Sequence, residues 1–171
     1  LAYIDINLSS LQCMQSNLAE SLLAAARRHA LEPADLRLEI TETAAHHSPA
    51  FMKKTLDALV ASGFSLSIDD FGIGFSNLGT LMSFPFRSVK LDRSLVSTAD
   101  RSEEGRAALE ELVSMLAGLE AEVVAEGIET EAQLELLRRL GVPLIQGFYY
   151  SRPLPARDFL AFAAGRGKSC T

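Results

Sequence analysis

The most informative part of the sequence is residues 64–76, which read Phe64-Ser65-Leu66-Ser67-Ile68-Asp69-Asp70-Phe71-Gly72-Ile73-Gly74-Phe75-Ser76. The first half is typical of a short buried strand, which we expect over Ser65–Asp69. This strand would deliver two adjacent carboxylates into a loop with glycine hinges at Gly72 and Gly74. Buried carboxylates are costly unless a cation neutralises them, and oxygen ligands suit Mg²⁺ or Mn²⁺. Taken alone, the stretch is equally typical of a strand that ends in a polar turn.

The composition is that of one globular domain. The chain has 171 residues, of which 48% are apolar and 22% charged, enough for a substantial core. Its formal net charge is −6, and acids and bases are interspersed, so we expect no DNA or RNA partner. No apolar run approaches the roughly 18 residues that span a bilayer, and we expect no membrane contact by this segment.

The cysteines and histidines point to no zinc site. Cys13 and Cys170 are far apart and match no metal or redox spacing. Free thiols indicate a reducing compartment, so we expect a cytoplasmic protein or the cytoplasmic part of a larger membrane-associated one. The adjacent pair His46-His47 is interpreted as two exposed side chains that point apart.

Around residues 64–76 the chain repeats a strand followed by a helix. The expected strands are Ala2–Leu8, Leu36–Thr41, Ser65–Asp69, Ser88–Leu91, Glu122–Glu126 and Leu144–Gln146. The expected helices are Asn17–Ala30, Pro49 to Gly63, Asn77–Met82, Glu103–Leu119, Thr130 to Gly141 and Pro155–Ala164. Capping signals support three of these starts, namely Asn17 with Glu20, Ser48 before Pro49, and Thr130 with Gln133.

This alternation indicates parallel strands and an α/β fold without a second domain. Six units fit an open doubly wound sheet, whereas a closed barrel needs eight. Polar residues lie at or just after the end of every expected strand: Asn7; Glu39 and Glu42; Asp69 and Asp70; Lys90 and Asp92; Glu126 and Glu129; and Gln146. Each alone also fits an ordinary role, such as a turn cap or a rim salt bridge. Together they favour a barrel, which brings all strand ends to one ring.

Six ordered motifs carry a resemblance to a known family. They are Ile6-Asn7-Leu8-Ser9, Leu38-Glu39-Ile40-Thr41-Glu42, Ile68 to Ser76, Val89-Lys90-Leu91-Asp92, Ala125 to Thr130, and Gln146-Gly147-Phe148. In this order they resemble the EAL domain family of cyclic di-GMP phosphodiesterases. The resemblance implies an α/β fold, a (β/α)8 TIM-like barrel of which about six units are present. It would occupy residues 1–164, followed by a polar tail over 165–171.

The resemblance also implies hydrolysis of cyclic di-GMP to linear pGpG with two Mg²⁺ or Mn²⁺ ions. Asn7, Glu39 and Asp69 match ligands of the first metal, and Asp69 bridges to the second. Asp70 matches a ligand of the second metal. Glu126 matches a residue that binds this metal or its water.

The remaining matches concern water, substrate and the loop. Lys90 matches the residue that orients or deprotonates the attacking water, and Glu129 would hold Lys90 in place. Because carboxylates surround Lys90, we expect it to stay protonated and to act first as a positioning cation. Gln146 and Asp92 would contact substrate or water. Glu42 would anchor the loop that contains Gly72 and Gly74.

One departure from the family pattern affects the expected activity. The Glu-Ala-Leu motif that names the family is not in this sequence, and residue 1 matches the start of the family's second barrel strand. We therefore expect an N-terminally truncated domain that is nearly inactive by itself. An open barrel leaves strand edges unpaired, so we expect a homodimer, and regulatory or diguanylate cyclase-like domains in the full-length protein.

Three functions remain open from the sequence. The first is a metal-dependent cyclic di-GMP phosphodiesterase, favoured by the complete set of downstream motifs. The second is a sensor domain that binds cyclic di-GMP without cleaving it, which the missing glutamate makes credible. The third is a protein-interacting scaffold that neither binds nor cleaves the dinucleotide.

Overall fold

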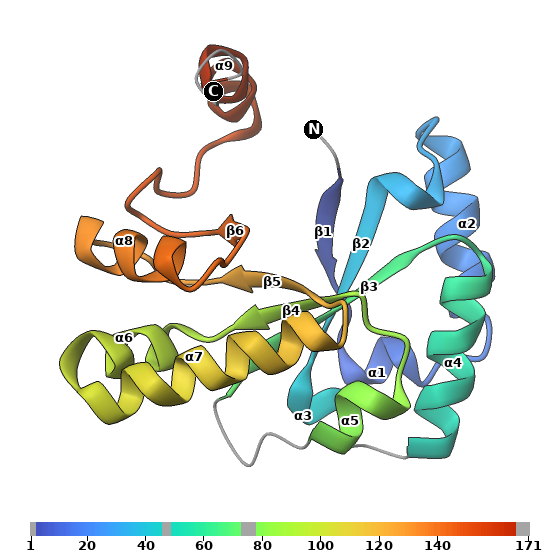
Figure 1. Cartoon of the computed structure of the whole chain (residues 1–171). Helices are drawn as coiled ribbons and strands as arrows, with labels where there is room; N and C mark the ends of the chain where they lie inside the picture. Colours follow the sequence, from blue (N-terminus) through green and yellow to red (C-terminus); the bar gives the residue numbers. More distant parts are fainter. Residues whose placement is uncertain (1–2, 46–48, 73–77, 167–171) are drawn as a thin grey trace.

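A single parallel sheet organises the fold. The computed structural model describes residues 3–45, 49–72 and 78–166 (Figure 1). The strands are β1 (Ile4–Asn7), β2 (Leu36–Thr41), β3 (Ser65–Phe71), β4 (Ser88–Leu91), β5 (Glu122–Ala125) and β6 (Leu144–Ile145). They pair in sequence order from β1 to β6, all parallel. A doubly wound sheet reverses its strand order at a switch point, so the open-sheet alternative is wrong. The chain forms six strands of a barrel, a half-barrel, as expected.

Helices cover the outer face of this sheet. The helices of the described residues are α1 (Ser10–Cys13), α2 (Leu18–Arg28), the 3₁₀ helix η1 (Pro33–Asp35), α3 (Glu42–Ala45), α4 (Pro49–Ala61), α5 (Leu78–Ser83), α6 (Arg93–Arg101), α7 (Glu103–Gly118), α8 (Glu131–Arg139) and α9 (Ala156–Arg166). In Figure 1, α2 and α4 lie on the side of β1–β3, and α6, α7 and α8 lie on the side of β4–β6. The last helix, α9, follows an extended segment and stands away from the sheet (Figure 1). In the part of the chain that the structure describes, no helix is both long and apolar enough to cross a membrane.

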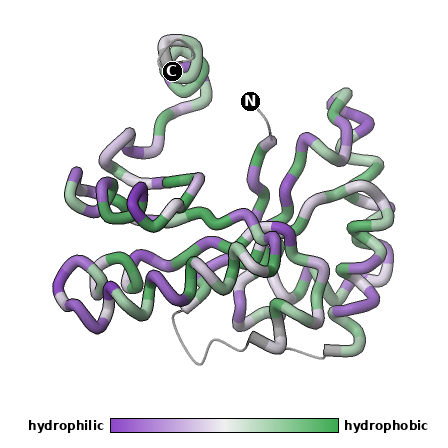
Figure 2. Tube along the Cα trace, viewed as in Figure 1, coloured by the Kyte–Doolittle hydropathy of each residue, from purple (hydrophilic) through white to green (hydrophobic). Residues whose placement is uncertain are grey.

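The hydrophobic core lies between the sheet and these helices. One buried group joins β2 and β3 to α2 and α4 and includes Leu38, Leu56 and Leu66. A second group joins β4 and β5 to α6, α7 and α8 and includes Leu116 and Leu137. Figure 2 shows hydrophilic and hydrophobic residues alternating along the outer helices, as expected for amphipathic segments. Side chains alternate between the two faces of a strand. Because the apolar residues of β2–β4 face the helices, their polar residues lie on the inner face of the sheet.

Most expected elements are confirmed, and the differences have local causes. The bounds of β2 and β4 are as expected, and β3 continues two residues beyond the expected end. The capping box at the start of α8 is confirmed, because Gln133 N–H donates to Thr130 Oγ1 at 3.3 Å and Thr130 N–H donates to Gln133 Oε1 at 3.3 Å. The predicted cap at Asn17 is wrong, since its side chain makes no capping hydrogen bond with α2.

Several short helices were not expected from the sequence. These are α1, η1, α3 and α6, of which the first three have four residues or fewer, too few to show a helical pattern. The start of α6 is stabilised by Asp92, which accepts a hydrogen bond from Ser94 N–H at 2.9 Å. Some of the sequence predictions concern positions outside the described residues, namely Ser48, Gly74, Cys170 and the pair His46-His47.

Gly147 is packed too closely to tolerate a side chain. A Cβ at this position would collide with the backbone of Ile128. This contact exists because Ile128 N–H donates to Gln146 O at 3.2 Å and Tyr149 N–H donates to Ile128 O at 2.9 Å. We predict that Gly147→Ala lowers the free energy of unfolding by about 1–3 kcal/mol, measured by urea denaturation.

The matched control for this substitution is Gly118→Ala at the end of α7. A Cβ there would meet nothing within 4 Å. Alanine is the better helix former by up to about 1 kcal/mol, so the control should be neutral or stabilising. Equal stability of the Gly147→Ala variant and the unsubstituted chain would contradict the prediction.

Candidate active site

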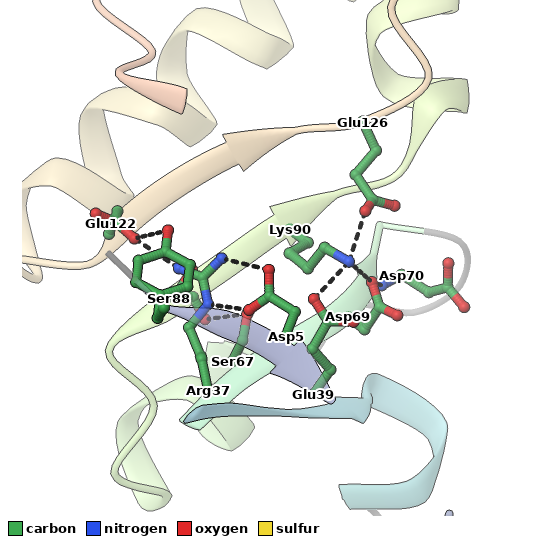
Figure 3. Close-up of polar contacts among 11 residues, drawn as sticks. Asp5, Arg37, Glu39, Ser67, Asp69, Asp70, Ser88, Lys90, Glu122 and Glu126 are labelled. Atoms are coloured by element: carbon green, nitrogen blue, oxygen red, sulfur yellow. Dashed lines mark hydrogen bonds and ion pairs between the residues drawn. The ribbon is translucent and has the colours of Figure 1, made fainter. Parts of the chain in front are cut away.

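Lys90 lies at the centre of a buried acidic cluster on the inner face of the sheet. Both Lys90 and Glu39 are 4% exposed. The Lys90 Nζ atom lies 2.6 Å from Glu39 Oε1, 2.7 Å from Glu126 Oε1 and 3.3 Å from Asp69 Oδ1 (Figure 3). These acids come from β2, from the loop after β5 and from β3. Together with β4, which carries Lys90, four elements therefore meet at this cluster.

The acids keep Lys90 in its charged form. Burial alone would lower the pKa of Lys90, but its close contacts with the Glu126 and Glu39 carboxylates and the charge of Asp69 raise that pKa above its ordinary value. Burial raises the pKa of Glu39 and of Glu126, and the Lys90 cation opposes both shifts. These directions agree with the expectation that Lys90 stays protonated.

A bulge in β3 directs Asp69 and Asp70 to the same place. Adjacent side chains of a regular strand point to opposite faces. Here the register between β3 and β4 shifts between Ile68 and Phe71, and Asp70 has φ +56°, in the left-handed region. Aspartate tolerates this conformation better than most residues because its side chain forms local hydrogen bonds. As a result, one carboxylate oxygen each from Asp69, Asp70 and Glu126 lies within 4.8 Å of the others.

This cluster fits a divalent cation. Burial raises the pKa of Asp70, and the charges of Asp69 and Asp92 raise it further, so negative charges repel one another here. Glu39 Oε1 is buried and lacks a well-aligned hydrogen bond, although Lys90 Nζ lies 2.6 Å away. All donors in the cluster are oxygens, which hard cations such as Mg²⁺, Mn²⁺ and Ca²⁺ prefer.

The other expected site residues lie around this cluster. Asn7 ends β1, pairs in register with Glu39 and is exposed. Glu42 is buried in α3 and accepts a hydrogen bond from Gly72 N–H at 3.5 Å, a contact suited to anchoring the loop after β3. The Glu129 N–H donates to Gln133 Oε1. In the described residues, the ion pairs of Lys90 do not include Glu129, whose role as its holder stays a prediction.

A cleft of about 440 Å³ adjoins the cluster. Its polar lining includes the expected residues Asp92, Glu126, Glu129 and Gln146, together with Arg93 and Arg152. Its apolar lining comes from the segment after β6 and from α9, namely Phe148, Pro153, Leu154, Phe159 and Phe162. The Arg152 guanidinium lies 4.9 Å from the centroid of the Phe148 ring. The sequence reasoning missed both arginines and the α9 aromatic residues, because neither set belongs to the motifs at the strand ends.

The protein-family comparison identifies the class of domain. A family model described as EAL domain matches residues 2–153. The chain therefore belongs to the EAL domain family.

Two curated relatives from Pseudomonas aeruginosa support this assignment. The bifunctional diguanylate cyclase/cyclic di-GMP phosphodiesterase MucR is 40% identical over 161 residues, which are 94% of this chain and 24% of MucR. The cyclic di-GMP phosphodiesterase RocR is 35% identical over 148 residues, 86% of this chain and 38% of RocR. The chain thus spans about a quarter to two fifths of the length of these relatives.

Solved structures agree with the fold. A MucR phosphodiesterase in complex with c-di-GMP has a TM-score of 0.85 and 39% identity, with 92% of this chain and 64% of that chain covered. A manganese/cy-diGMP complex of Klebsiella pneumoniae BlrP1 has a TM-score of 0.83 and 33% identity, with 88% of this chain and 39% of that chain covered.

The buried position of Lys90 makes a prediction about stability. We predict that Lys90→Met lowers the free energy of unfolding by about 3–5 kcal/mol in EDTA, because it leaves Glu39, Asp69 and Glu126 without their cation. Urea denaturation measures the change. Lys53→Met is the matched control: Lys53 forms a surface pair with Asp57 at 3.2 Å, and both side chains are at least 50% exposed. The control should change stability by under about 1 kcal/mol. Equal effects of the two substitutions would contradict the prediction.

Proposed function

We propose that the EAL domain of this chain hydrolyses cyclic di-GMP to linear pGpG. The observation that carries the proposal is the convergence of three carboxylates, from Asp69, Asp70 and Glu126, beside the buried ammonium of Lys90. The names of MucR and RocR as cyclic di-GMP phosphodiesterases support the choice of substrate.

The acidic residues would hold two Mg²⁺ or Mn²⁺ ions. Asn7, Glu39 and Asp69 would serve the first ion, and Asp69, Asp70 and Glu126 the second. Bound divalent cations lower the pKa of water and neutralise charge on a phosphodiester, which is the chemistry that this hydrolysis needs. The manganese complex of BlrP1 supports Mn²⁺ as one of the metals.

The chain's own side chains would orient water and substrate. A protonated Lys90 keeps Glu39, Asp69 and Glu126 at fixed positions and would orient the attacking water beside them. Glu42 would hold the loop after β3 through Gly72. Glu129, Gln146 and Asp92 would face the substrate from the cleft wall.

The adjoining cleft suits a dianionic guanine dinucleotide. Arg93 and Arg152 supply positive charge for a phosphate, and Phe148 and the α9 aromatic residues supply apolar surface for a base. A mixed lining of aromatic side chains and a few charged groups is typical of small-molecule sites.

A second candidate is a domain that binds cyclic di-GMP without cleaving it. The observation in its favour is the cleft beside the acids, because its arginines and aromatic side chains could hold the dinucleotide without any cleavage. We further propose a cytoplasmic location, a homodimer, and regulatory or diguanylate cyclase-like domains in the full-length protein. The double activity in the name of MucR supports the last of these.

Two assays distinguish the candidates. The phosphodiesterase hypothesis predicts release of pGpG with Mn²⁺, weakly from this chain and strongly from a chimera in which an EAL-domain first strand with the Glu-Ala-Leu motif precedes residue 1. The sensor hypothesis predicts that calorimetry detects binding of cyclic di-GMP and that neither protein releases pGpG. Calorimetric binding without turnover by the chimera would overturn the proposed hydrolysis.

Metal binding gives an independent prediction. We predict that Asp69→Asn weakens Mn²⁺ binding by more than about 10–100-fold, the range for groups that only support metal ligands. Electron paramagnetic resonance of free Mn²⁺ measures the affinity. Asp57→Asn, at an exposed acid of α4, is the control and should leave the affinity unchanged. Equal affinities of the two variants would contradict the assignment of Asp69.

A further inference from the structure

A second polar cluster lies on the same inner face, toward the amino ends of the strands. Its centre is the guanidinium group of Arg37 on β2, a residue that is only 4% exposed. Arg37 donates to both carboxylate oxygens of Asp5 on β1, at 2.6 and 3.1 Å. Its Nη1 atom donates to Ser88 Oγ on β4 at 3.1 Å and to Glu122 Oε2 on β5 at 2.6 Å. Figure 3 shows this cluster beside the Lys90 cluster.

Tyr3 completes the Arg37 cluster. The Arg37 guanidinium carbon lies 4.0 Å from the centroid of the Tyr3 ring, and Tyr3 Oη donates to Glu122 Oε2 at 3.3 Å. The guanidinium is thus fixed by groups from β1, β4 and β5 and from the residue before β1. Its planar fork lets one side chain bind several acceptors at once, which an ammonium does less well.

These contacts require the sheet to curl. β2 and β5 are separated by two strands, so in a flat sheet they would lie about 14 Å apart. Side chains stand roughly perpendicular to a sheet, so the tips of Arg37 and Glu122 would stay apart by a similar distance. Their separation of 2.6 Å shows that curvature brings β5 over β2. Arg37 ties the two sides of the half-barrel together across its inner face.

The same strands carry the candidate site two or four residues further along. Asp5 precedes Asn7, Arg37 precedes Glu39, Ser88 precedes Lys90, and Glu122 precedes Glu126. Residues two apart on a strand share a face, so the two clusters are successive polar layers inside one curved sheet. Any change in the separation of β1, β2 and β5 at the Arg37 layer alters the separation of the acids above it.

We propose that Arg37 is a positioning residue that sets the spacing of Asn7, Glu39 and Glu126 for the divalent cations. The inference rests on the proposed function, because it concerns the same metal site. Without the guanidinium, Asp5 and Glu122 lose their common partner, and their like charges oppose the curvature that brings β1 and β5 together. The site would open although none of its own residues had changed.

The test compares Arg37→Met with Arg87→Met. Arg87 lies at the same end of the sheet, directly before β4, and its side chain is exposed and has no ion pair within the described part of the chain. Both variants are studied well below their unfolding temperatures, with circular dichroism to verify folding. Arg37→Met should weaken Mn²⁺ binding about 10–100-fold, as removal of other supporting groups does, and Arg87→Met should leave it unchanged. Arg37→Lys should recover part of the affinity.

Amide chemical shifts give a readout that does not depend on the metal. In metal-free protein, Arg37→Met should move the nuclear magnetic resonance signals of Asn7 and Glu126, and Arg87→Met should not. A folded Arg37→Met variant with unchanged Mn²⁺ affinity and unchanged signals would overturn the proposal, even if it melts earlier. If the unsubstituted chain binds no Mn²⁺, the proposed metal site fails, and the amide signals alone decide the role of Arg37. If Arg37→Met does not fold, Asp5→Asn and Glu122→Gln replace it, and unchanged affinity and signals in both would overturn the proposal.

Discussion

The fold holds several carboxylates together on the inner face of a curved sheet, although these groups repel one another. Glu39, Asp69, Asp70 and Glu126 surround one buried cation, Lys90, so acids outnumber bases in the cluster. Such an arrangement is unfavourable in isolation, because burial and like charges both oppose ionisation. The bulge in β3 and the left-handed conformation of Asp70 keep the acids together. Backbone strain of this kind persists where the surrounding fold enforces it.

The two faces of the sheet have different roles: the outer face contributes stability, and the inner face carries the candidate site. The outer face packs against α2, α4, α6, α7 and α8 and supplies the hydrophobic core. The inner face carries two layers of charged residues, centred on Arg37 and Lys90, where a (β/α)8 barrel is commonly filled by bulky apolar side chains. Strand alternation achieves this separation, since one residue in two faces each side. The site can therefore be strongly polar without weakening the core.

Sequence reasoning predicted the strands and most acids of the site because both depend on local patterns. Parallel strands gather their carboxyl ends, so Glu39, Asp69, Lys90 and Glu126 were expected to meet. The sequence shows Asp69 and Asp70 as neighbours in a motif, but it does not show that both carboxylates reach the same place. The bulge that brings them together depends on the pairing of β3 with β4. The role of Arg37 was missed, since a charged residue in a strand reveals nothing about contacts three strands away. The arginines and aromatic residues of the cleft were missed for the same reason.

We expect Asp69, Asp70 and Glu126 to bind a divalent cation in this fold. Anomalous diffraction from a crystal of the chain soaked in Mn²⁺, recorded at the manganese absorption edge, tests it most directly. We expect a strong anomalous peak between these three carboxylates, with oxygen ligands at distances typical of hard cations. Ordered density for the three side chains with no peak between them, at a Mn²⁺ concentration that occupies other sites, would contradict it.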